Sequence, residues 1–108
     1  MAYDEALAKR IRHAIARKKD FTEKKMFGGV GFMLNGNLCC GIWQNSLVVR
    51  LSAEDYEKAL TQQAVKKFDI TGRPMTSWVL VRSDGIKGKR LEEWIKMAIR
   101  YVSALPPK

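Results

Sequence analysis

Two adjacent cysteines, Cys39 and Cys40, are the first residues whose type and spacing suggest chemistry. A cysteine pair offers redox chemistry or two soft metal ligands, but a metal site needs further ligands at workable spacing, and no second cysteine pair or nearby histidine supplies them. Side chains alternate along a strand, so we expect Cys40 in the core and Cys39 half-exposed. We expect no disulfide, a reducing compartment and no bound metal.

The single histidine, His13, lies with Lys9 and Arg17 on the polar face of a predicted helix. No serine or cysteine can be placed beside it from the sequence, so a surface role is favoured over a general base. The chain also lacks a paired-carboxylate motif. We therefore predict no catalytic residue and no cofactor, and a protein that is not an enzyme.

Two short segments have the composition of anion-binding loops. Gly28-Gly29-Val30-Gly31 resembles a phosphate loop, but such a loop must open a helix and here a strand follows, so the glycines are expected to permit a tight or bulged connection. Lys87-Gly88-Lys89-Arg90 precedes a predicted helix, whose N-terminus attracts phosphate or sulfate unless Glu92 and Glu93 neutralise it. The candidate anion or nucleic-acid contacts are Lys87, Lys89 and Arg90.

Periodicity and capping signals divide the chain into three helices and a sheet. Helices are predicted over 4–18, from Ser52 to about Thr61, and over 89–105. Strands are predicted over 22–27, 30–34, 38–43, 46–51 and 77–82, with 68–70 as a short further candidate. The expected fold is a two-layer α+β domain, in which an antiparallel sheet of about five strands packs against N-terminal, central and C-terminal helices.

The turns fix which side chains share a face of this sheet. Asn35-Gly36 predicts a two-residue type I′ turn that sets Phe32 opposite Cys39, and Gln44-Asn45 predicts a second turn. A three-residue first loop would reverse the faces of the strand before it. The expected core face holds Met33, Leu38, Cys40, Ile42, Leu47, Val49 and Leu51. The opposite face holds Val30, Phe32, Leu34, Cys39, Trp43, Val48 and Arg50.

Aromatic residues and an arginine on that opposite face suggest a binding surface, because such clusters are typical interface anchors. The alternative is that a helix covers the face. Arg73 stands before Pro74, and a following proline biases a residue toward an extended backbone. In that conformation the guanidinium of Arg73 is suited either to a carboxylate or phosphate of a partner or to a hydrogen bond within its own turn. The candidate partner-binding residues are Phe32, Trp43, Val48, Arg50 and Arg73.

Length and charge restrict the class of protein. The 108 residues are 46% hydrophobic and 29% charged, as in one globular domain spanning 1–108. No apolar run is long enough for a membrane span and no secretion signal opens the chain, so we expect a cytoplasmic protein without a membrane partner. Twenty Lys and Arg against eleven Asp and Glu give a formal charge of +9, which attracts acidic proteins and nucleic acids.

Several segments stand in an order and spacing that resemble one known family. They are Lys24-Lys25-Met26-Phe27-Gly28-Gly29, Cys39-Cys40-Gly41, Arg50, Thr71-Gly72-Arg73-Pro74-Met75 and Trp78-Val79. The chain resembles the TfoX/Sxy N-terminal domain family over essentially its whole length. The resemblance implies a two-layer α+β fold, no known catalytic activity, and a link to bacterial competence regulators that act with a cyclic-AMP-responsive transcription factor. Full-length regulators carry a second, helical domain, whereas this chain ends shortly after its last predicted helix.

Three classes of function remain open. The favoured one is a small regulatory or adaptor domain that acts by protein contact in transcription or competence-type regulation, with the transcription machinery or a second copy of the chain as partner. The alternative is a weakly specific nucleic-acid-binding protein that uses its basic surface. An uncharacterised enzyme is the least favoured.

Overall fold

The computed structural model describes residues 4–15, 21–26, 29–68 and 77–106, and its helices and strands confirm the α+β class. The elements follow one another as α1 (Glu5–Ile15), β1 (Phe21–Met26), β2 (Gly29–Leu34), β3 (Asn37–Trp43), β4 (Ser46–Arg50), α2 (Ala53–Ala59), β5 (Val65–Lys67), β6 (Trp78–Val81), a 3-10 turn η1 (Ser83–Gly85) and α3 (Arg90–Val102).

The six strands of the described residues belong to one antiparallel sheet with the order β1-β2-β3-β4-β6-β5. The additional strand is β5, which has only three residues and precedes the position expected for it. Phe68 follows β5, and its backbone N–H donates to the carbonyl of Trp78 at 3.3 Å. Residues 69 and 70, the rest of the expected strand, lie outside the described residues.

The start of α2 and the Asn35-Gly36 turn have the predicted local chemistry, and α1 has a cap of its own. A carboxylate oxygen of Asp4 accepts the N–H of Ala6 at 2.9 Å and begins α1. The Ser52 hydroxyl accepts the N–H of Asp55 at 3.2 Å and begins α2. Asn35 and Gly36 have φ values of 53° and 82°, as a type I′ turn requires.

A β-bulge corrects the predicted faces. Beyond the Met33–Leu38 pair, Phe32 pairs with Cys40 instead of Cys39, so Cys39 is an extra residue on β3. Both cysteines are consequently buried in the main core, at 0% exposure, and the expectation of a half-exposed Cys39 is wrong. The bulge also turns the side chains of β2. Val30, Phe32 and Leu34, expected on the opposite face, belong to the main core, whereas Met33 is only half-buried.

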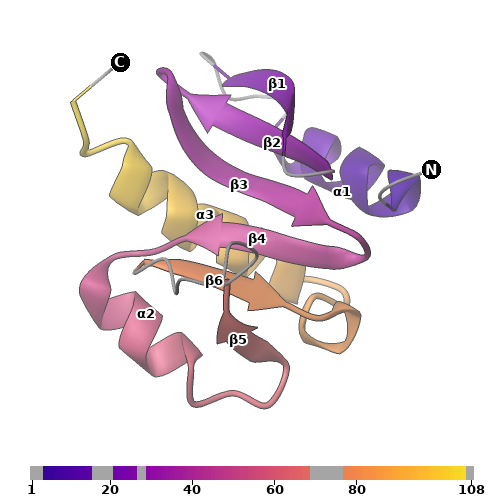
Figure 1. Cartoon of the computed structure of the whole chain (residues 1–108), viewed down its shortest axis with the longest axis vertical. Coiled ribbons are helices and arrows are strands. Elements are labelled where there is room, and N and C mark those ends of the chain that lie inside the picture. The colour runs from indigo at the N-terminus through magenta and orange to yellow at the C-terminus, as the bar shows by residue number, and fades with distance from the viewer. Residues whose placement is uncertain (1–3, 16–20, 27–28, 69–76, 107–108) are drawn as a thin grey trace.

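The second hairpin keeps its predicted register, with Gly41 opposite Val48 and Ile42 opposite Leu47. All three helices bury side chains in the main core, and α3 passes behind β3 and β4 in Figure 1. Trp94 of α3 is buried there and its indole N–H donates to the carbonyl of Gly85 at 3.0 Å. The helices thus cover one face of the sheet, which confirms the two-layer arrangement, and no helix of the described residues lies on the opposite face.

Candidate partner-binding surface

A second, smaller cluster lies on the sheet face away from the helices. Val48 of β4 pairs with Leu80 of β6, and both are buried together with Phe68. Trp43 and Trp78 pack against this centre and are only partly buried. We call this set, together with Arg50, the aromatic strip; it consists of Trp43, Val48, Arg50, Phe68, Trp78 and Leu80.

The rings of the strip are held by defined contacts. Trp43 meets Phe68 edge-on, with ring centroids 6.5 Å apart and an interplanar angle of 68°. This is a favourable aromatic geometry, because the positive edge of one ring faces the negative face of the other. The buried centre therefore fixes the two tryptophans at its margins while leaving part of each ring accessible.

Arg50 pairs with Trp78 at the end of the strip away from Trp43, and its side chain also contacts α3 on the helical side of the sheet. Its guanidinium carbon lies 5.4 Å from the centroid of Trp78 and 5.7 Å from that of Tyr101 on α3. Cation–π attraction to two rings restricts the orientation of the side chain. The Nε atom is buried, and none of the described residues accepts a hydrogen bond from it or forms an ion pair with Arg50. A guanidinium held in this way is suited to a planar carboxylate.

The structure brings together three of the five predicted partner-binding residues. Trp43, Val48 and Arg50 share the strip, although Val48 is fully buried and supports the surface from below. Phe32 does not belong to it, because the bulge places this ring in the main core at 1% exposure. Arg73 lies outside the described residues.

Sequence reasoning missed Trp78, Tyr101 and Phe68 as members of the site or its surroundings. Trp78 had a usable signal, because it begins a strand of alternating large side chains. Tyr101 gave none, since its contact with Arg50 joins residues 51 positions apart. Such a contact follows from the packing of α3 against β4, which a local pattern does not encode.

The predicted anion contacts form an open surface. Lys87 and Lys89 are exposed, and Lys89 caps α3 without a side-chain hydrogen bond. Arg90 donates instead to the Gln62 side chain at 2.7 Å. Glu92 and Glu93 stand in the first turn, where they complement the helix dipole. The cationic groups therefore do not converge on one enclosed point.

The residues first considered for chemistry are separated in space. His13 is exposed on α1, whereas Cys39 and Cys40 are buried in the core. Over 4–15, 21–26, 29–68 and 77–106, no group of three or more His, Cys, Asp or Glu is arranged to hold a metal ion.

The architecture defines a two-layer α+β domain with a six-stranded antiparallel sheet. A family model described as the TfoX N-terminal domain matches residues 13–102. The chain therefore belongs to the TfoX N-terminal domain family, as the sequence resemblance implied. No curated protein and no solved structure matches it. Among the described helices, none has the length and hydropathy that a membrane crossing requires.

Proposed function

We propose that this chain is a small regulatory or adaptor domain that acts by protein contact in transcription or competence-type regulation. The observation that carries the proposal is Arg50, held between Trp78 and Tyr101 with no ion-pair partner among the described residues. Family membership supports a regulatory role. Together they favour a docking module over a catalyst.

The aromatic strip has the composition of an interface centre. Tryptophan, tyrosine and arginine are the residues that most often dominate binding energy, since each buries a large area and offers a polar group. In this strip the tryptophans flank a buried centre of Val48, Leu80 and Phe68. A partner that covers the strip would bury the exposed parts of Trp43 and Trp78 and place a carboxylate against Arg50.

Site-specific photo-crosslinking in the source cells tests this proposal. A benzophenone amino acid is introduced at Trp43 or at Lys66, an exposed residue of β5 paired with Leu80. Its neighbour Lys67 is the matched control, because successive side chains on a strand point to opposite faces. We expect positions 43 and 66 to crosslink the same discrete protein, and position 67 not to do so.

Regulation is tested by a second measurement on the same strains. Arg50→Ala removes the guanidinium and should abolish the shared crosslink and alter the same transcripts as deletion of the gene. Equal crosslinking from positions 66 and 67 would contradict the docking role of the strip. An unchanged transcript profile in the deletion strain would contradict the regulatory role.

Weakly specific nucleic-acid binding is the second candidate function. It is favoured by the exposed Lys87 and Lys89, for which the structure shows no ion pair among the described residues. Exposed lysines of this kind can contact phosphates without reading bases. This candidate predicts binding that depends strongly on salt and little on sequence.

A further inference from the structure

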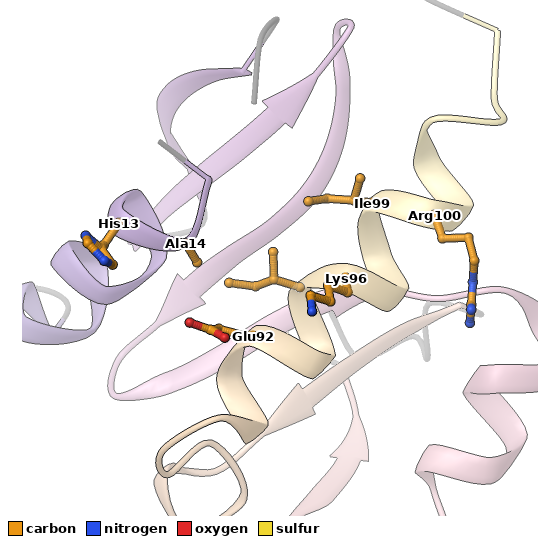
Figure 2. A pocket seen from close by; sticks show the side chains of 7 residues that line it. His13, Ala14, Glu92, Lys96, Ile99 and Arg100 are labelled. Carbon is orange, nitrogen blue, oxygen red and sulfur yellow. The ribbon is translucent and has the colours of Figure 1, made fainter. Parts of the chain in front are cut away.

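A groove of about 470 Å³ lies between α1 and α3 on the helical side of the molecule (Figure 2). Ala14, Ile95 and Ile99 supply its apolar surface. The polar side chains at its margins are His13 of α1 and Glu92, Lys96 and Arg100 of α3. Because these margins are exposed, the groove is an open channel between two helices.

A second hollow of about 410 Å³ continues the groove toward the start of α3. The two hollows share His13 and Glu92, and the second adds Lys9, Arg10, Gly88 and Leu91. The combined groove begins at Gly88, just before α3, and follows that helix from Leu91 to Arg100. At the rise of an α-helix, the part from Leu91 to Arg100 is roughly 14 Å long, and the whole groove is longer by the segment that contains Gly88.

Positive charge dominates the margins of the combined groove. Lys9 and Lys96 form no ion pair with any described residue, and Lys96 stands one turn after Glu92 without bonding to it. Arg10 is fixed by donating to the carbonyl of Ile86 at 2.6 Å. Arg100 lies 3.3 Å from a carboxylate oxygen of Asp55 and points toward α2. Among the described residues, Glu92 is the one carboxylate in the lining of the two hollows.

We propose that this groove binds an acidic amphipathic helix, about three turns long, from a partner protein. A helix laid between α1 and α3 would place an apolar stripe against Ala14, Ile95 and Ile99, in the manner of other helix-in-groove complexes. Acidic residues beside that stripe would meet Lys9 on one margin and Lys96 on the other. The charge of the groove thus specifies the charge of its occupant.

Two other occupants fit the groove less well. A second copy of this chain would bring a basic helical surface against an equally basic one, which is electrostatically unfavourable. A small molecule is normally enclosed on most of its surface, whereas this groove is open along its length. The groove and the aromatic strip lie on opposite faces of the sheet, so the inference goes beyond the proposed function and does not depend on it.

Selection from a displayed peptide library tests the proposal. The library consists of 14-residue peptides with leucine fixed at positions 1, 5, 8 and 12 and the remaining positions random, and the bait is the full chain. We expect the enriched peptides to carry Asp and Glu beside the leucine stripe. A labelled representative is then titrated against variants by fluorescence anisotropy.

Single charge changes locate the binding site. Lys96→Glu and Lys9→Glu should each weaken binding roughly five- to tenfold, because each replaces an attraction by a repulsion at an exposed pair. Lys24→Glu makes the same change of net charge on β1, where the side chain is exposed and away from the groove, and should change affinity less than about twofold. Glu92→Gln removes the carboxylate of the lining and should strengthen binding about two- to threefold.

Misfolding would weaken peptide binding, so it cannot explain the stronger binding expected for Glu92→Gln. Circular dichroism checks the fold of every variant. Failure to enrich peptides, or enrichment of neutral or basic ones, would overturn the proposal. Equal losses in Lys96→Glu and Lys24→Glu would also overturn it, since binding would then follow net charge alone. A dimer that Lys96→Glu dissociates in sedimentation equilibrium would assign the groove to a second copy instead.

Discussion

Cys39 and Cys40 are consecutive on β3, yet both side chains are buried in the same core. The hydrogen bond with Cys39, burial and the nearby Cys39 sulfur together raise the pKa of the Cys40 thiol well above its usual range. Cys40 therefore stays protonated at neutral pH. This pair fills the core and is poorly suited to nucleophilic chemistry, which requires an accessible thiolate.

The burial of both cysteines predicts slow thiol chemistry. With an aromatic disulfide reagent, neither thiol of the native protein should react within the time in which free cysteine is consumed. Both should react in urea, because unfolding exposes them together. One rapidly reacting equivalent in the native state would show that Cys39 is accessible and would contradict the bulge.

The raised pKa of Cys40 predicts a loss of stability in alkali. Above the pKa of an unfolded cysteine, about 8.5, the unfolded chain releases this proton while the folded chain retains it. The free energy of unfolding should therefore fall as the pH rises from that value toward the folded pKa. Urea denaturation between pH 7 and 10 measures the slope, and Cys40→Ala should make it shallower. An identical slope in the variant would assign the alkaline loss to other groups.

Phe32 and Trp43 should respond differently to truncation. Phe32→Ala removes a ring that is 1% exposed in the main core and should cost about 3–5 kcal/mol of stability. Trp43 is only partly buried at the margin of the strip, so Trp43→Ala should cost about 1–2 kcal/mol and leave the protein folded. Denaturant titration compares the two, and equal losses would contradict the assignment of Phe32 to the core.

Gly29 is required for close packing of two strands. A Cβ atom at this position would overlap the carbonyl oxygen of Ile42 on β3, so Gly29→Ala should destabilise by about 2–3 kcal/mol. Gly88 is the control, because a Cβ there meets nothing within 4 Å and the obstacle is its φ of +58°. Gly88→Asn should be nearly neutral, since asparagine tolerates that backbone, whereas Gly29→Asn should be at least as harmful as Gly29→Ala. Thermal unfolding distinguishes the two cases.

Nucleic-acid binding through the basic surface should be weak. At near-physiological salt we expect a Kd for duplex DNA no tighter than about 1 µM, with little difference between sequences and a steep decrease in affinity on adding salt. Reversing Lys87, Lys89 and Arg90 to Glu should remove part of the binding. Fluorescence anisotropy measures this, and nanomolar, sequence-selective binding would instead favour nucleic-acid recognition as the primary function.

Local chemistry predicted most of the fold. The Asn35-Gly36 turn, the Ser52 cap and the amphipathic helices follow from backbone preferences and periodicity, and each occurs near its expected place. The three-residue strand β5 could not be recognised, because two of its three side chains are exposed lysines. This segment is a strand because it pairs with β6, and its own residues do not show a strand pattern.

The candidate surfaces were less predictable because they depend on contacts between distant elements. The bulge at Cys39 is one extra residue within a strand, and it moves Phe32 from the predicted surface into the core. The Arg50–Tyr101 contact and the groove beside Ile99 both require the position of α3 relative to the rest of the molecule. The composition of the strands suggested a surface of aromatic residues and an arginine. Which residues belong to that surface is determined by how the strands and α3 pack together.

The two outer strands of the sheet also bear on the solubility of the protein. No described strand pairs with the outer edge of β1 or of β5, and such edges can template polymerisation in other proteins. Here each edge strand carries a pair of exposed lysines, Lys24 and Lys25 on β1 and Lys66 and Lys67 on β5. Two copies of the chain that paired through any of these edges would bring lysine side chains of one copy close to those of the other. Charge repulsion at both edges thus discourages the growth of continuous sheets from copy to copy.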